Sequence, residues 1–472
     1  MSELWRLSGA EVSRRIKQRY FTAREATEAA LARLEAVNPK INAITTRTDE
    51  TALEAADAVD AAVARGEAPP LAGMPITVKE NVDQAGYATT NGLRMQKDMV
   101  AEADNPVVAN LKRAGAIIVG RTNMPAFGLR WFTRNALEGG TLNPWNPKLT
   151  PGGSSGGAAA ATATGIGAMG HGTDIGGSVR YPAYACGLQG LRPTLGRFPV
   201  WNPSSPDRHI GGQIMAVSGP HARTVEDLTV STKAMMAPDL RDPWHTPVPF
   251  DMGEFPRKAA LCVAPEGLAT QPAVEASLRE AAQRLSDAGW EVTEIDGDAT
   301  PGFREPARLQ AQLWLAEMRR GGGQAIADEN DPDTVYVYAE MQKLSPDPSL
   351  NDILDALQAR LGLLRAWQAF FTEYPVLICP VSAEPPFPDH LDTQDFPRCI
   401  EAQLTQVGLP LMGLPGLTVF TGFAETEHGP APLGGQLLGG RFREDILLAA
   451  GAAIEARGRK PGIAEPDWDP IL

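Results

Sequence analysis

The sequence contains little cysteine and little histidine. Four cysteines are spread along 472 residues with no C-x-x-C pair, and six histidines are dispersed with no H-E-x-x-H pattern. A disulfide framework and a zinc site both require such residues at short, regular spacing. We therefore expect no metal and no other cofactor, and we expect reduced thiols at Cys186, Cys262, Cys379 and Cys399.

The sequence also lacks a long apolar run and an excess of positive charge. No stretch approaches the roughly 20 apolar residues that cross a bilayer, and the N-terminus carries charges where a secretory leader needs an apolar run. The chain has 43 basic and 57 acidic residues, a formal net charge of −14, which disfavours binding to nucleic-acid phosphates. We expect a cytoplasmic protein that binds neither membrane nor nucleic acid, and the sequence leaves open whether it forms a homodimer.

The remaining composition is that of a folded protein, with 43% apolar and 21% charged residues. Residues 1–66 are predicted to be helical, because Ser8 and Thr22 each begin a capping box and Gly66 is a typical helix stop. Beyond them, short β-branched runs alternate with helical patterns, which indicates an α/β fold. We predict a helical N-terminal segment, residues 1–66, packed on an α/β domain of residues 67–472.

A glycine-rich segment, residues 139–187, contains two serine motifs. One is GSSG at 153–156 and the other is GGS at 176–178. Glycine lets the backbone turn sharply and lets its N–H groups approach a ligand. Exposed N–H groups beside a hydroxyl nucleophile form an oxyanion hole, so the segment favours acyl transfer.

Two other interpretations of the glycine-rich segment compete with this one. A phosphate-binding loop needs a lysine after the glycines, and none follows. The sequence GGSSG at 152–156 satisfies the G-x-S-x-G nucleophile elbow, which would make Ser154 the nucleophile and His390 or His428 its base. No clear strand precedes this serine, which disfavours the elbow.

Three stretches together resemble the amidase signature family: GMPITVKENVD at 73–83, TPGGSSGGAAAA at 150–161 and GTDIGGSVRYPA at 172–183. The resemblance is close over residues 5–230 and loose in the C-terminal half. It implies a large, mixed, twisted β-sheet covered by helices on both sides. It also implies an amidase that hydrolyses a carbon–nitrogen amide bond through an acyl-serine intermediate.

Members of that family use a Ser–cis-Ser–Lys triad in place of Ser-His-Asp. The resemblance places the nucleophile at Ser178, the proton relay at Ser154 with a cis peptide before it, and the base at Lys79. Asp174 and Arg180 flank the nucleophile and are expected to form an ion pair that holds the glycine loop. The oxyanion would be held by the backbone N–H groups of Ile175, Gly176, Gly177 and Ser178.

The surroundings of Lys79 in the sequence suit a base. A lysine accepts a proton only when it is neutral, so its pKa must fall from about 10.4. Burial lowers that pKa, and the apolar run at 75–78 can carry Lys79 into the interior. His171, seven residues before Ser178, is the alternative base, and Cys186 is the alternative nucleophile.

Aromatic residues indicate the class of substrate. By resemblance, the segment with Phe127 and Trp131 passes near the acyl pocket, and we expect Trp314, Tyr336 and Tyr338 on its other side. An aryl or bulky apolar amide is the predicted substrate, although such rings equally suit a plain core. The alternative function is that of the glutaminase component of a glutamyl-tRNA amidotransferase, whose usual Ser-Asn-Glu-Thr-Ser run is absent here.

Overall fold

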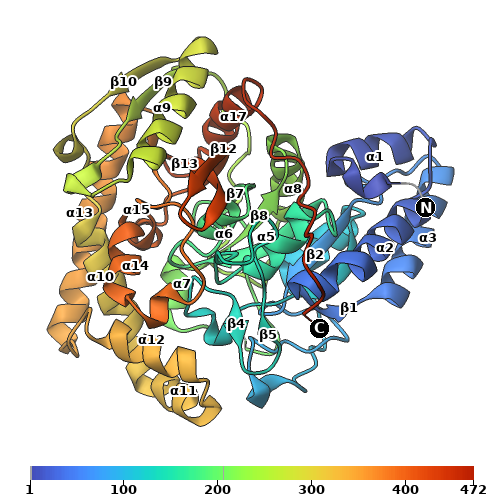
Figure 1. The fold of residues 1–472 in the computed structure, drawn as a ribbon, viewed down its shortest axis with the longest axis horizontal. Coiled ribbons are helices and arrows are strands. Elements are labelled where there is room, and N and C mark those ends of the chain that lie inside the picture. Colours follow the sequence, from blue (N-terminus) through green and yellow to red (C-terminus); the bar gives the residue numbers. More distant parts are fainter. Residues whose placement is uncertain (1–2, 206, 472) are drawn as a thin grey trace.

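The computed structural model describes residues 3–205 and 207–471. Its centre is a twisted sheet of 11 strands (Figure 1). In spatial order the strands are β1 (Ile44–Arg47), β3 (Ile117–Thr122), β2 (Pro75–Lys79), β6 (Met169–Asp174), β8 (Val217–Ala222), β7 (Gln189–Arg192), β12 (Gly416–Thr426), β13 (Gly429–Gly439), β11 (Val376–Pro380), β9 (Lys258–Leu261) and β10 (Glu291–Glu294). A separate pair is formed by β4 (Arg134–Asn135) and β5 (Gly139–Gly140).

The sheet is mixed, as the resemblance implies. Strand β2 is parallel to both of its neighbours, β3 and β6. Strand β6 is antiparallel to β8, and β12 is antiparallel to β7 and to β13. The parallel arrangement of β2 and β6 brings their carboxyl ends to the same edge of the sheet, which is where Lys79 and Asp174 lie.

Helices cover the sheet on both faces. Every residue of β2 and of β11 is buried, and successive residues of a strand point to opposite faces, so both faces must be covered. On β12, Leu417 lies against Gly451, whereas Thr418 donates a hydrogen bond to the Arg180 carbonyl. Helix α17 (Glu444–Glu455) and helix α6 (Arg180–Ala185) therefore pack on opposite faces.

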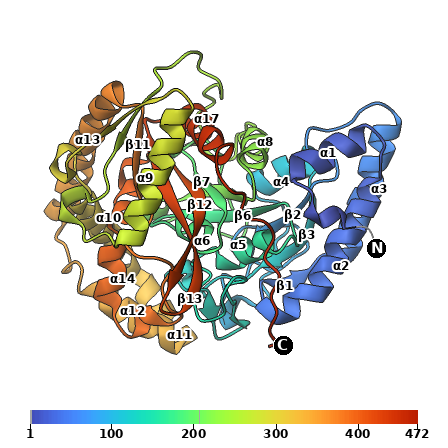
Figure 2. The same cartoon turned by 45° about the horizontal axis from the view of Figure 1, so that its top comes forward.

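The N-terminal helices lie at one end of the molecule (Figure 2). They are α1 (Gly9–Lys17), α2 (Ala23–Ile41) and α3 (Asp49–Ala64). The expected caps are present, since Ser8 accepts from the Glu11 N–H and Thr22 forms a complete capping box with Glu25. The segment is not wholly helical, because β1 lies between α2 and α3 and adds an edge strand to the main sheet.

The remaining helices surround the centre and the opposite end of the molecule (Figure 1). They are α4 (Pro106–Arg113), α5 (Gly156–Ala163), α7 (Ile210–Met215), α8 (Val225–Met235), α9 (Pro272–Asp287), α10 (Arg304–Glu317), α11 (Gly323–Glu329), α12 (Pro332–Gln342), α13 (Leu350–Glu373), α14 (Phe396–Ala402), α15 (Leu404–Val407) and α16 (Leu409–Met412). None of the helices in residues 3–205 and 207–471 is both long enough and apolar enough to span a bilayer.

Candidate active site

Lys79 ends β2 in the interior of the protein and is fully buried. Its Nζ contacts three hydroxyl oxygens: Ser154 Oγ at 2.8 Å, Ser155 Oγ at 3.0 Å and Thr173 Oγ1 at 3.0 Å. No carboxylate among the described residues forms an ion pair with this amine. Burial lowers the pKa of Lys79 to about 7, although the charges of Asp174 and Glu80 act in the opposite direction.

Ser154 is held beside Lys79 by a backbone that only glycine allows. A Cβ on Gly153 would lie 2.5 Å from the Arg130 carbonyl oxygen and 2.7 Å from the Phe132 nitrogen. The loop is therefore pressed against the 130–132 segment, and the Gly153–Ser154 peptide bond is cis, as the resemblance implies. Helix α5 begins two residues after Ser154.

Ser178 lies in the loop between β6 and α6, and the Asp174 carboxylate organises this loop. That carboxylate accepts hydrogen bonds from the backbone N–H groups of Gly177 at 3.1 Å and Val179 at 3.2 Å. It also forms ion pairs with Arg180 at 3.0 Å and Arg192 at 3.2 Å, and all three charged side chains are fully buried. Burial alone would raise the pKa of Asp174, but the two arginines outweigh it and hold this pKa well below its usual range.

The loop N–H groups assigned to the oxyanion are not equally free. Gly177 donates to Asp174, so this N–H group already has an acceptor, contrary to the expectation that it is available. The N–H groups of Ile175, Gly176 and Ser178 have no acceptor among the described residues. The carbonyls of Ile175 and Gly176 accept from Gln310 Nε2 and Trp131 Nε1, each at 3.0 Å, and these bonds fix the orientation of both peptides.

Ser178 lies where two cavities meet, and we call them the apolar cavity and the polar cavity. The apolar cavity has a volume of about 220 Å³ and the polar cavity about 230 Å³. Both are lined by Ser178, Gly128, Ile175 and Trp314. Ser154 also lines the polar cavity, but no hydrogen bond joins the Ser154 and Ser178 hydroxyls within the described parts of the chain.

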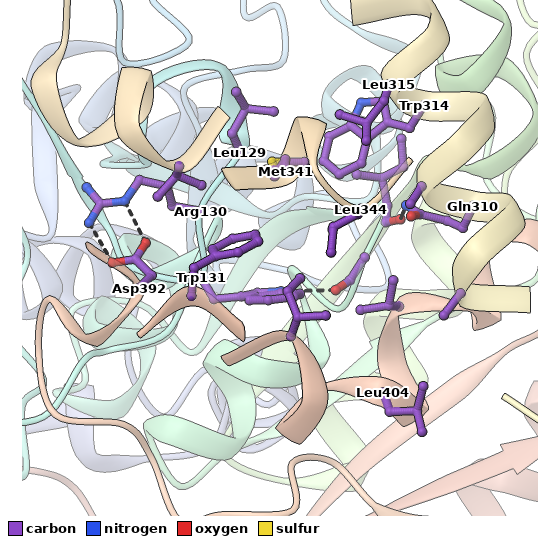
Figure 3. Close-up of a pocket in the computed structure, with 18 of the residues that line it drawn as sticks. Leu129, Arg130, Trp131, Gln310, Trp314, Leu315, Met341, Leu344, Asp392 and Leu404 are labelled. Carbon is purple, nitrogen blue, oxygen red and sulfur yellow. Dashed lines mark hydrogen bonds and ion pairs between the residues drawn. The ribbon is translucent and has the colours of Figure 1, made fainter. Parts of the chain in front are cut away.

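The apolar cavity is closed by the C-terminal half of the chain (Figure 3). Its apolar lining includes Leu129, Trp131, Ala311, Trp314, Leu315, Val337, Met341, Leu344, Phe396, Ile400, Leu404 and Val407. Arg130 and Asp392 also reach it, but they pair with each other through hydrogen bonds of 2.8 and 2.9 Å. This pair leaves no unpaired charge from either residue in the cavity.

The aromatic residues chosen from the sequence have different positions. Trp131 and Trp314 line the apolar cavity, as expected, whereas Phe127 lines the polar one. Tyr336 and Tyr338 line neither cavity, so their expected place on the pocket wall is wrong. Val337 lines the apolar cavity instead, because successive residues of α12 point about 100° apart: Tyr336 is exposed, and Tyr338 is buried away from the cavity.

The alternative bases and nucleophile lie elsewhere. Ser154 Oγ accepts a hydrogen bond from Lys79, and no histidine contacts Ser154 in the described structure. The interpretation of Ser154 as a nucleophile with His390 or His428 as its base is therefore wrong. His171 Nε2 is paired with Ser218 Oγ at 3.0 Å, and burial lowers the pKa of this imidazole to about 3. Cys186 is buried, and burial raises the pKa of its thiol, so it is a poor source of thiolate.

The Amidase family model matches residues 25–448 of this chain. This chain belongs to the amidase family. It is similar to an indoleacetamide hydrolase of Bradyrhizobium diazoefficiens, with 39% identity over 96% of this chain and 87% of the relative. It is also similar to a subunit of the glutamyl-tRNA(Gln) amidotransferase of Roseiflexus sp., with 32% identity over 96% of this chain and 97% of the relative.

The fold matches that of a solved bacterial aryl acylamidase of the amidase signature family. The TM-score is 0.83 at 25% identity, over 96% of this chain and 97% of the other. The chain is thus a hydrolase of carbon–nitrogen amide bonds with the amidase-signature fold, as the resemblance implies.

Sequence reasoning missed several polar residues of this amidase. Ser155 and Thr173 contact Lys79 Nζ, and Arg192 shares Asp174 with Arg180. Ser155 and Thr173 stand beside motif residues in the sequence, which could have drawn attention to them. Arg192 gives no such signal, because its place at the site depends on the pairing of β7 within the sheet.

Proposed function

We propose that this amidase hydrolyses amides of aryl or other bulky apolar carboxylic acids, with Ser178 as the nucleophile. The observation that carries this proposal is the position of Ser178 on the wall of a cavity of about 220 Å³ with a largely apolar lining. An aryl group in this cavity is removed from water, which contributes about 25 cal/mol for each Å² of apolar surface buried.

Lys79 acts as the base in the proposed mechanism. A neutral amine has two N–H donors and one lone pair, and Lys79 Nζ has three hydroxyl neighbours, so one hydroxyl can donate to the lone pair. We assign this donor to Ser154, at 2.8 Å. Lys79 takes the Ser154 proton while Ser154 takes the proton of Ser178, whose oxygen then attacks the amide carbon.

The two hydroxyls must come together for this transfer. They line the same cavity without a hydrogen bond, and catalytic hydrogen bonds of an empty site commonly tighten only when substrate is bound. The oxyanion is held by the backbone N–H groups of Ile175, Gly176 and Ser178, with Gly177 contributing only if it shares its bond to Asp174. Ser154 then gives its proton to the leaving nitrogen as the carbon–nitrogen bond breaks and takes one back from Lys79, which is neutral again when water hydrolyses the acyl-serine.

The comparisons support an aryl acyl group. The relative at 39% identity is named for the hydrolysis of indoleacetamide, an amide that carries its aromatic ring on the acyl side. The glutaminase component of an amidotransferase is the alternative function for this chain. Glutamine has a charged amino group and a charged carboxylate, whereas the charged side chains that line the apolar cavity are already in ion pairs, which disfavours glutamine there. These pairs are Arg130 with Asp392, Arg304 with Glu401, and Arg308 with Glu305.

A panel of amides tests the proposal. We expect kcat/KM to be highest for indole-3-acetamide and phenylacetamide, lower for propionamide, and lowest for glutamine. The Ser178→Ala variant provides the background rate. Turnover of glutamine in preference to the aryl amides, with or without added partner subunits, would overturn the proposal and favour the amidotransferase role.

A further inference from the structure

The polar cavity contains an arginine without a carboxylate partner. Arg208 lines this cavity beside Ser178, and its Nη1 donates to the Gly212 carbonyl at 3.2 Å. Its other N–H groups have no acceptor among the described residues. By contrast, Arg180 and Arg192 are both paired with Asp174.

No ion pair joins Arg208 to an acidic side chain among the described residues. Asp174 also lines the polar cavity, but its charge is shared by Arg180 and Arg192. Asp242 acts on the charge of Arg208 without forming an ion pair with it, and its two oxygens accept from the Val200 N–H at 2.7 Å and the Trp244 N–H at 2.9 Å. The Arg208 guanidinium thus has no ion-pair partner within the described chain.

The same cavity also contains an acceptor without a donor. Asn81 Nδ2 donates to Thr173 Oγ1 at 3.0 Å, but Asn81 Oδ1 is buried and has no partner among the described residues. Thr173 Oγ1 in turn contacts Lys79 Nζ at 3.0 Å, so Asn81 lies next to the base. A buried acceptor left unpaired costs about 1–3 kcal/mol.

The segment that carries Arg208 is fixed to the end of β2. Asn202 donates to the Asn81 carbonyl at 3.0 Å and accepts from the Asp83 N–H at 3.2 Å. Ser204 donates to Asp83 from its backbone and from its hydroxyl, both at 2.8 Å. These bonds tie Asn202 and Ser204 to the residues that follow Lys79 in the sequence.

The size of the cavity exceeds what a primary amide requires. Ammonia is about as large as water, which occupies roughly 30 Å³ in the liquid. The polar cavity has a volume of about 230 Å³. A leaving group of several heavy atoms fits this space, and Arg208 on its wall suits one that carries a negative charge.

We propose that the polar cavity binds the leaving amine and that this amine carries a carboxylate. The substrate class is then an N-acyl amino acid, with the aryl acyl group in the apolar cavity and the carboxylate paired with Arg208. The carbon–nitrogen bond breaks, the amino acid nitrogen takes its proton from Ser154, and water releases the aryl acid from Ser178. This inference rests on the function proposed above.

Four amides with one acyl group test the inference: phenylacetamide, N-phenylacetylglycine, N-phenylacetyl-β-alanine and the neutral N-phenylacetylethanolamine. We expect the enzyme to prefer at least one of the two carboxylates to the ethanolamide. Arg208→Gln should lower kcat/KM for that carboxylate about tenfold to a hundredfold, because a hydrogen bond to a charged group is lost. It should change kcat/KM for phenylacetamide by less than about twofold.

Two further variants control this experiment. Arg208→Lys keeps the charge and should retain part of the preference. Arg241→Gln removes an exposed arginine that pairs with Asp239, and it should leave the preference unchanged. Equal kcat/KM for the carboxylates and the ethanolamide would overturn the inference, and so would an equal loss on all four amides in Arg208→Gln. In either case, hydrolysis of phenylacetamide would leave the proposed function intact. If the enzyme hydrolyses none of the four amides, the proposed function itself is overturned.

Discussion

The pH dependence of the reaction gives the most direct test of Lys79 as the base. Burial lowers the pKa of Lys79 from the ordinary 10.5 to about 7. At pH 7 about half of the enzyme then carries a neutral lysine, compared with roughly 3 in 10,000 molecules at the ordinary pKa. Burial therefore increases the reactive fraction roughly 1,500-fold at this pH.

The expected profile follows from the sign of this shift. Since the neutral form is active, kcat/KM should fall about tenfold for each pH unit below 7 and reach a plateau above about pH 8. Phenylacetamide suits the assay, because its amide does not ionise in this range. Initial rates at low substrate concentration report the free enzyme, and thermal unfolding at each pH separates titration from loss of structure.

Glu80 titrates in the same range and must be distinguished from Lys79. Burial raises the pKa of Glu80 to about 7. The charge of Glu80 also raises the pKa of Lys79, so Glu80→Gln should move the acid limb to lower pH without removing it. If the acid limb of the kcat/KM profile disappears in Glu80→Gln, Lys79 is not the titrating base. An acid limb near pH 10 in the parent enzyme would likewise refute the idea that burial makes Lys79 neutral.

Three substitutions test other parts of the site. Ser178→Ala should abolish turnover and leave the melting temperature unchanged, and retained hydrolysis would remove Ser178 as the nucleophile. Asp174→Asn should lower the free energy of unfolding by about 3–5 kcal/mol, because Arg180 and Arg192 stay buried without a counter-charge. Urea titration measures this loss, and a loss below about 1 kcal/mol would contradict the expectation. Ala311→Leu fills part of the apolar cavity and should lower kcat/KM at least tenfold for indole-3-acetamide but not for propionamide, and equal effects on both would separate this cavity from substrate binding.

The sequence predicted the part of the site that short motifs encode. Lys79, Ser154 and Asp174 lie in local patterns whose residues also shape the backbone, such as Gly153 against the 130–132 segment. The ion pair of Asp174 with Arg180 was predictable, because both flank one loop and both become buried. The mixed sheet followed from the family resemblance.

Other features depend on distant packing and leave little trace in the sequence. Strand β1 has only four residues between two helices, and its pairing with β3 decides its conformation. The wall of the apolar cavity comes from α10 and α12, and the sequence could not tell whether Tyr336, Val337 or Tyr338 would face inward. The rotation of a helix about its axis is set by its neighbours.

The two arginines on Asp174 connect the structure of the loop to the chemistry of the base. The charge of Asp174 is the largest of those that raise the pKa of Lys79, and an unpaired carboxylate there would favour the protonated, inactive amine. Arg180 and Arg192 oppose this effect, since their positive charges offset that carboxylate at close range. The same pairs keep Asp174 ionised, so that it can accept from the N–H groups of Gly177 and Val179 and hold the loop that carries Ser178. The ionised Asp174 holds the loop, and Lys79 nearby must stay neutral. The two can therefore exist side by side only because Asp174 is paired with two arginines.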